Sequence, residues 1–138
     1  MGAYYVSFDD HSHPDWVAFS TPVSSPQIAK YKTIKSIDFA RAHVTDASIQ
    51  NIARLERIEM IHLTHCDITD SQLDLLAKVG SLGILRLNHT TVTDESIPAI
   101  ASINDLISVD LSDTLVTDDG VAQLKERCPG ITIRHEPQ

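Results

Sequence analysis

Two stretches of the chain, IEMIHLTHCDITD at residues 58–70 and LGILRLNHTTVTD at residues 82–94, share one pattern 24 residues apart. The pattern extends in both directions, because Thr-Asp pairs begin at Thr45, Thr69, Thr93 and Thr117. Six apolar columns keep the same step through four units, and the first of them holds Ile34, Ile58, Leu82 and Leu106. A fixed period of this length predicts a solenoid, in which each repeated unit stacks on the next.

The periodicity changes within each unit, and this change predicts one strand and one helix. Residues 37–39 alternate apolar, polar and apolar, as a half-buried strand does. Ile49, Ile52 and Leu55 recur every three residues, which is typical of one face of a helix. One strand and one helix cannot bury their apolar faces alone, so neighbouring units must cover each other.

The Thr-Asp pairs are well placed to begin the helices, because short side-chain oxygens accept the free amide protons of a first turn. Gln72 follows Thr69 by three residues and would complete a capping box in the second unit. Pro98 falls where a helix starting at Asp94 first needs an amide proton. The third helix is therefore expected to be irregular or to start near Ser96.

The units match the pattern L-x-x-L-x-L-x-x-N/C-x-L, and the chain therefore resembles leucine-rich repeat proteins over residues 34–133. The repeated Val/Ile-Thr-Asp and the closing CPGI at residues 128–131 resemble the cysteine-containing subclass and the bacterial arrays of Thr-Asp type. The position usually held by Asn or Cys departs from the pattern in three units, and carries Ala42, Cys66, Thr90 and Thr114. We predict an α/β, right-handed leucine-rich-repeat solenoid, with a short parallel sheet on its concave face and helices on its convex face.

The ends of the chain differ from the array, and we predict two parts. Residues 1–33 would form an N-terminal cap, because a solenoid exposes its core at an end that nothing covers. Aromatic and β-branched runs at residues 4–8 and 16–19 flank a polar stretch and suggest a hairpin, and residues 26–31 suggest a degenerate helix. Residues 34–138 would form four full repeats and a terminal strand around Ile131 and Ile133.

Composition narrows the classes of partner. The chain has 11 basic and 19 acidic residues and a net charge of -8, which disfavours nucleic acid and anionic membrane surfaces. No apolar run approaches the roughly 18 residues that a membrane span needs, and no signal peptide is visible. Two cysteines cannot form a disulfide framework, so we expect structural roles for Cys66 and Cys128. Together these features predict a cytoplasmic protein.

The predicted strands carry a candidate binding surface. In each strand, the residues beside the buried position should face the concave side, and one more exposed position follows the strand. These positions differ in chemistry from unit to unit. Such variation on a repeated backbone can make a surface specific for one partner. The predicted partner-binding residues are Asp38, Arg41, Met60, His62, His65, Ile84, Arg86, His89, Asp110 and Asp113.

We interpret the chain as a non-enzymatic protein–protein interaction module, monomeric or weakly oligomeric, without a cofactor or a metal. The first alternative is a subunit or assembly factor of a larger complex, which contacts its neighbours through its ends or its convex helices. Neither a Gly-rich phosphate loop nor a nucleophile elbow is present in the sequence.

The histidines leave a remote alternative, a metal-dependent hydrolase. Adjacent units would bring His65, His89 and Asp113 within reach of one zinc ion. A second group of possible ligands lies in the polar stretch at residues 9–13, where a solvated turn is the simpler interpretation. A serine triad could also be drawn from Ser108, His62 and Asp110, but any mixed polar face would allow one.

Overall fold

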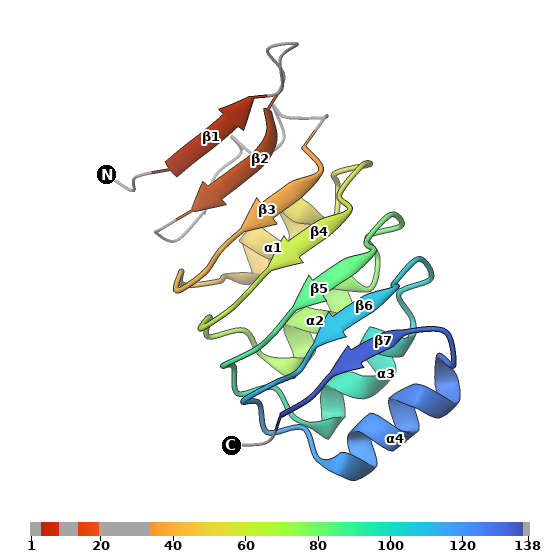
Figure 1. The fold of residues 1–138 in the computed structure, drawn as a ribbon. Coiled ribbons are helices and arrows are strands. Elements are labelled where there is room, and N and C mark those ends of the chain that lie inside the picture. The colour runs from red at the N-terminus through yellow and green to blue at the C-terminus, as the bar shows by residue number, and fades with distance from the viewer. Residues whose placement is uncertain (1–3, 9–13, 20–33, 137–138) are drawn as a thin grey trace.

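The computed structural model describes residues 4–8, 14–19 and 34–136 of the chain, the first two ranges as backbone strands (Figure 1). Short strands alternate with short helices after residue 34, as the change of periodicity predicts. The elements are β1 (Tyr4–Phe8), β2 (Pro14–Phe19), β3 (Ser36–Asp38), α1 (Asp46–Ile52), β4 (Met60–His62), α2 (Asp70–Leu76), β5 (Ile84–Arg86), the 3₁₀ turn η2 (Asp94–Ser96), α3 (Ile97–Ala101), β6 (Ser108–Asp110), α4 (Asp118–Arg127) and β7 (Thr132–Arg134).

All the described strands form one sheet in chain order, from β1 to β7. β1 and β2 pair antiparallel, and every later pair is parallel. From β3 onward, paired residues are 24 positions apart, so that Ser36, Met60, Ile84, Ser108 and Thr132 share one row. The sequence period is therefore the register of the sheet.

The helices α1 to α4 lie on one side of the sheet and leave its other side uncovered (Figure 1). We call this uncovered side the open face. Its side chains come from the first and third residues of each parallel strand from β3 to β7, and they are Ser36, Asp38, Met60, His62, Ile84, Arg86, Ser108, Asp110, Thr132 and Arg134.

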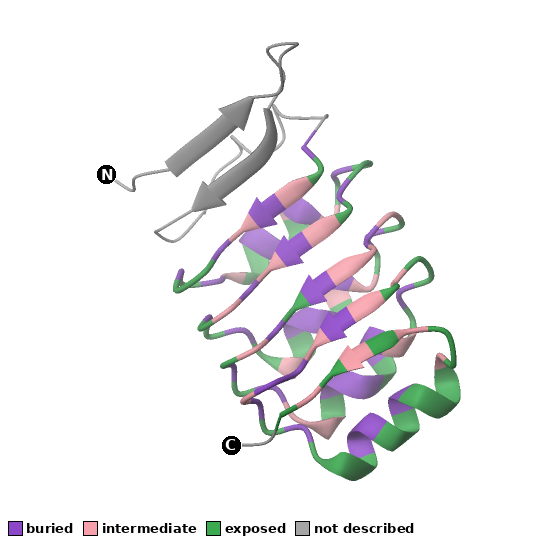
Figure 2. Cartoon of the chain, in the orientation of Figure 1, coloured by how far each residue is buried: buried purple, intermediate pink, exposed green. Residues whose placement is uncertain are grey.

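The core lies between the sheet and the helices. The middle residues of β3 to β6 are fully buried, while their neighbours on the open face are half-buried or exposed (Figure 2). Every position of the six predicted apolar columns is buried except Leu106, which is half-buried. The next residue in that column is Gly130, which has no side chain to cover Leu106. The predicted core is thus confirmed.

The helix starts follow the expected capping chemistry. The side-chain oxygens of Thr45, Thr93 and Thr117 each accept a first-turn amide proton at 3.2 Å. Thr69 and Gln72 form the predicted capping box, in which the Thr69 amide donates to Oε1 of Gln72 at 3.1 Å. The third helix is irregular, as expected from its proline, because it begins as η2 and becomes α-helical at Ile97.

The Thr-Asp pairs also join neighbouring units, which sequence reasoning missed. The carboxylate of Asp94 accepts hydrogen bonds from the amide and the hydroxyl of Thr117, at 2.8 and 2.6 Å. Asp70 makes the same two bonds to Thr93, at 2.9 and 2.8 Å. A β-carbon on Gly120 would lie 2.1 Å from Oδ1 of Asp94, so only glycine leaves room for this carboxylate. One dipeptide therefore caps its own helix and holds the following unit.

In three of the four units, the column that holds Cys66 supplies a small hydrogen-bond donor to a turn that follows a strand. Thr90 and Thr114 donate their hydroxyls to the carbonyls of Leu87 and Leu111, at 2.6 and 2.7 Å. The Cys66 thiol is buried and donates to the carbonyl of Phe39 at 2.8 Å. Burial raises the pKa of this thiol to about 11, so it stays protonated and inert at neutral pH. Cys66 and Cys128 are both free, in agreement with the structural roles expected.

The two ends of the array add strands to the sheet. β1 and β2 pair antiparallel at the positions where a hairpin is predicted, and β2 then pairs in parallel with β3. The predicted degenerate helix at residues 26–31 lies outside the described residues, and the boundary at residue 33 stays a prediction.

At the other end, β7 forms where the terminal strand is predicted. Ile131 and Ile133 pack against the core there. His135 occupies the column filled by Phe39 and then by leucine in the preceding units, and its side chain is 9% exposed. Its Nε2 lies 3.0 Å from the carbonyl of Val116.

Candidate functional site

The ten predicted site residues fall into three rows, two on the strands and one in the loops. Six of them project from the strands on the open face, namely Asp38, Met60, His62, Ile84, Arg86 and Asp110. The other four follow the strands in the loops, namely Arg41, His65, His89 and Asp113. The structure keeps each row in register, because the parallel strands pair residues that are 24 positions apart.

The third residues of the strands form what we call the outer row of the open face, which carries charges of both signs and continues beyond the predicted residues. It runs from Asp38 through His62, Arg86 and Asp110 to Arg134 on β7. Sequence reasoning missed Thr132 and Arg134, although the step of 24 residues from Ser108 and Asp110 leads directly to them. The terminal strand therefore contributes to the surface as well as ending the sheet.

His62 lies between Asp38 and Arg86 in this row and is half-buried. Its Nε2 lies 2.8 Å from the sulfur of Met60. Burial lowers the pKa of His62, the carboxylate of Asp38 opposes this shift, and the positive charge of Arg86 adds to it. His62 is therefore neutral at pH 7 and contributes a polar but uncharged ring to the open face.

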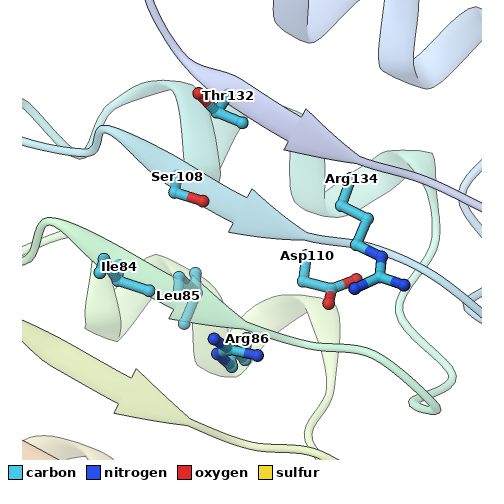
Figure 3. Close-up of a pocket in the computed structure, with 7 residues that line it drawn as sticks. All are labelled: Ile84, Leu85, Arg86, Ser108, Asp110, Thr132 and Arg134. Carbon is cyan, nitrogen blue, oxygen red and sulfur yellow. The ribbon is translucent and has the colours of Figure 1, made fainter.

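A shallow depression lies on the open face across β5, β6 and β7 (Figure 3). Its volume is about 240 Å³, and its lining residues are Ile84, Leu85, Arg86, Ser108, Asp110, Thr132 and Arg134. In Figure 3 the side chains of Asp110 and Arg134 point toward each other, and Arg86 lies on the strand at the other side of Asp110. Oδ1 of Asp110 also accepts the Ser112 amide at 3.0 Å.

The loop row has an unusual backbone. Arg41, His65, His89 and Asp113 have φ values of 63, 57, 58 and 54°, in the left-handed region that favours glycine. Such a conformation costs roughly 1–2 kcal/mol for a residue with a side chain. The amide of each residue donates to a carbonyl of the following unit, at 2.8 to 3.2 Å. These bonds extend the pairing of the units beyond the strands and offset the strain.

Two side chains of the loop row also stack. The imidazole rings of His65 and His89 lie nearly parallel, with centroids 4.2 Å apart and an angle of 3° between their planes. Nδ1 of His89 lies 3.3 Å from a carboxylate oxygen of Asp113. Rings stacked face to face do not direct their nitrogens at one point, so this arrangement does not favour the predicted zinc alternative. Within the described residues, no group of three or more His, Cys, Asp or Glu could hold a metal ion.

The other catalytic alternatives gain no support from the geometry. His62 pairs in register with Arg86, and Arg86 pairs with Asp110, so a whole strand separates the histidine of the drawn triad from its aspartate. The second group of possible metal ligands, at residues 9–13, lies outside the described residues.

The helical side has its own depression, which bears on the alternative of contact through the helices. Its volume is about 330 Å³, and its lining residues on and after α1 and α2 are Gln50, Ala53, Arg54, Leu75 and Lys78.

In the described part of the chain, no helix has the length and apolarity needed to cross a membrane.

Comparisons with known proteins support the fold. No known family profile matches the chain, and no curated protein matches it in sequence. Among solved structures, it is similar to an internalin (inlF) from Listeria monocytogenes, with a TM-score of 0.53 and 18% sequence identity. The match covers 78% of this chain and 36% of the internalin chain, so the chain spans about a third of its length.

The internalin is a leucine-rich repeat protein, and the likeness therefore supports a leucine-rich-repeat-like α/β fold with a parallel sheet. The subclass and the right-handed winding stay predictions.

Proposed function

We propose that this chain is a non-enzymatic protein–protein interaction module that binds its partner on the open face, which we predict to be concave. The observation that carries this proposal is the contrast between buried and open-face rows. Buried rows repeat one kind of residue, whereas the outer row changes from Asp38 to His62, Arg86, Asp110 and Arg134. Packing explains the buried rows, and a partner of matching chemistry explains the varied one.

The centre of the open face has the composition of an interface core. Met60 and Ile84 are neighbours in register and are only half-buried, so a partner could bury their remaining apolar area. Methionine adapts its shape to a partner, and the uncharged ring of His62 and the charged Arg86 lie beside the apolar pair on the same strands. A few central residues usually carry most of the binding free energy at such an interface. We therefore expect Met60 and Ile84 to matter more than the residues at the rim.

The test is capture of partners from the native source by purified variants, with quantitative mass spectrometry. The double variant Met60→Asp and Ile84→Asp should lose a partner that the wild-type protein retains, because it places charge at the centre of the face. Glu95→Lys is the matched control, because Glu95 is exposed in η2 on the helical side. A partner lost by Glu95→Lys and kept by the double variant would contradict the proposal.

A second candidate is a subunit or assembly factor that contacts a larger complex through its helices. The depression between α1 and α2 favours it, because Leu75 presents apolar area there beside Arg54 and Lys78. Leu75→Glu should then abolish co-purification with the complex and leave binding to the open face unchanged.

We also propose that the protein is a monomer or weak oligomer, which sedimentation of the purified protein tests. We propose a cytoplasmic location as well, which imaging of the tagged protein tests.

A further inference from the structure

Arg86 presents a charged group without a partner on the open face. It is exposed on β5, and no hydrogen bond or ion pair joins its guanidinium to another residue within 34–136. The facing carboxylate of Asp110 is held by the Ser112 amide at 3.0 Å. The planar fork of a guanidinium suits a carboxylate, which can accept two parallel hydrogen bonds from it.

Arg134 lines the same depression from β7. It pairs with Glu136 at 3.3 Å, but the two side chains are 65% and 69% exposed. An exposed pair of this kind contributes little free energy. A carboxylate from a ligand could therefore replace Glu136 at small cost.

The depression differs in charge from the chain as a whole. Two arginines and Asp110 line it, which leaves a net positive charge on a protein of net charge -8. A nucleic acid would be repelled by the overall charge, whereas a short acidic segment meets mainly the local one. Ser108 and Thr132 add hydroxyl donors, and Ile84 adds an apolar wall.

We infer that this depression binds an acidic segment of a protein partner in extended conformation, with carboxylates held by Arg86 and Arg134. The inference rests on the proposed function and names the chemistry of its partner. The arginines lie two strands apart, about 10 Å between their Cα atoms, since strands stack at about 4.8 Å. Alternate side chains of an extended segment point the same way and lie about 7 Å apart, which the long arginine side chains can span. The segment therefore carries acidic residues two positions apart and an apolar residue that packs on Ile84.

The probe is the fluorescein-labelled peptide Leu-Gly-Glu-Gly-Glu-Gly, in which Leu and both Glu lie on one face of the extended segment. A matched peptide has Gln in place of both Glu, and binding is measured by fluorescence polarisation at low salt. Wild-type protein should bind the Glu peptide at least about tenfold more tightly. Arg86→Gln and Arg134→Gln should each weaken binding by about three- to tenfold. Asp110→Asn should strengthen binding, because it removes the competing charge while asparagine keeps an acceptor for the Ser112 amide. Added salt should weaken binding to the Glu peptide.

Arg127→Gln is the matched control, because Arg127 is an exposed arginine in α4 on the helical side. Equal binding of the two peptides, or equal losses from Arg127→Gln and Arg86→Gln, would overturn the inference. The partner-capture experiment separates this failure from failure of the proposed function. A partner that is lost with Met60→Asp and Ile84→Asp, but kept with Arg86→Gln and Arg134→Gln, overturns the inference alone. A partner that the variant with Met60→Asp and Ile84→Asp still retains overturns the proposed function. The peptide measurements then still decide whether the depression binds an acidic segment.

Discussion

The Thr-Asp positions and the outer row of the open face both recur every 24 residues, yet only the first keeps the same residues. All four pairs begin a helix, and the aspartates of the second and third pairs, Asp70 and Asp94, each accept two hydrogen bonds from the threonine of the following unit. On the open face, the side chains of the outer row have neighbours along the row, and no described helix covers them. The repeated structure therefore requires the same residues where a side chain joins two units. It allows different residues where a side chain only faces outward.

Substitutions in the core should change the free energy of unfolding more than any other substitution considered below. Leu87 is fully buried, whereas the preceding residue, Arg86, lies exposed on the open face. Leu87→Ala should reduce the free energy of unfolding by about 2–5 kcal/mol, because it loses buried area and leaves a cavity. Arg86→Ala should change it by less than about 0.5 kcal/mol. Denaturant unfolding of both variants measures the difference, and equal losses would contradict the contrast in burial between the two residues.

The link between units should show the next largest effect. Asp94→Ala removes the acceptor of two bonds from Thr117 and should cost about 1–3 kcal/mol, at about 0.5–1.5 kcal/mol for each bond. Asp119→Ala is the control, because Asp119 also lies in a first helical turn but is exposed. A double-mutant cycle with Thr117→Val isolates the coupling. No coupling between Asp94 and Thr117 would show that the Thr-Asp pair only caps its own helix.

The turn column should show a smaller effect. Cys66→Ala should cost about 1 kcal/mol, because the bond to the Phe39 carbonyl and a little buried volume are lost. Cys66→Thr should cost less, since threonine occupies the same column at Thr90 and Thr114. Thermal unfolding compares the variants. A thiol reagent at pH 8 should label Cys128 well before Cys66 in the wild-type protein, and faster labelling of Cys66 would contradict the raised pKa.

The pH dependence of stability should show the smallest effect. Because the pKa of His62 is lowered in the folded protein, the unfolded chain binds more protons at mildly acidic pH. Its contribution is therefore complete above the unfolded value of about 6.5 and is lost as pH falls through the folded pKa. Melting temperatures across this range should fall less steeply for His62→Gln than for the wild-type protein. Parallel curves would show that the burial of His62 does not affect its titration.

Much of the candidate site follows from the sequence, and the remainder depends on how the units stack. The period placed Asp38, His62, Arg86 and Asp110 in one row, because parallel strands of a repeat pair at its own step. The same step leads to Arg134, which was missed because the terminal strand was interpreted only as the end of the array. The parallel stacking of His65 on His89 could not be predicted, because it depends on the backbone angles of two separate loops.

The sequence by itself determined the period, the buried columns, the helix caps and the break at Pro98. These features depend on spacing along the chain, because the geometry of a strand, a helix or a cap is set within a single unit. Only the tertiary structure decided that Asp70 and Asp94 hold the following units, that the loop residues adopt left-handed angles, and that Arg86 and Arg134 line one depression. Contacts across units depend on the separation and rotation of neighbouring strands and helices, and packing of the whole core sets those quantities.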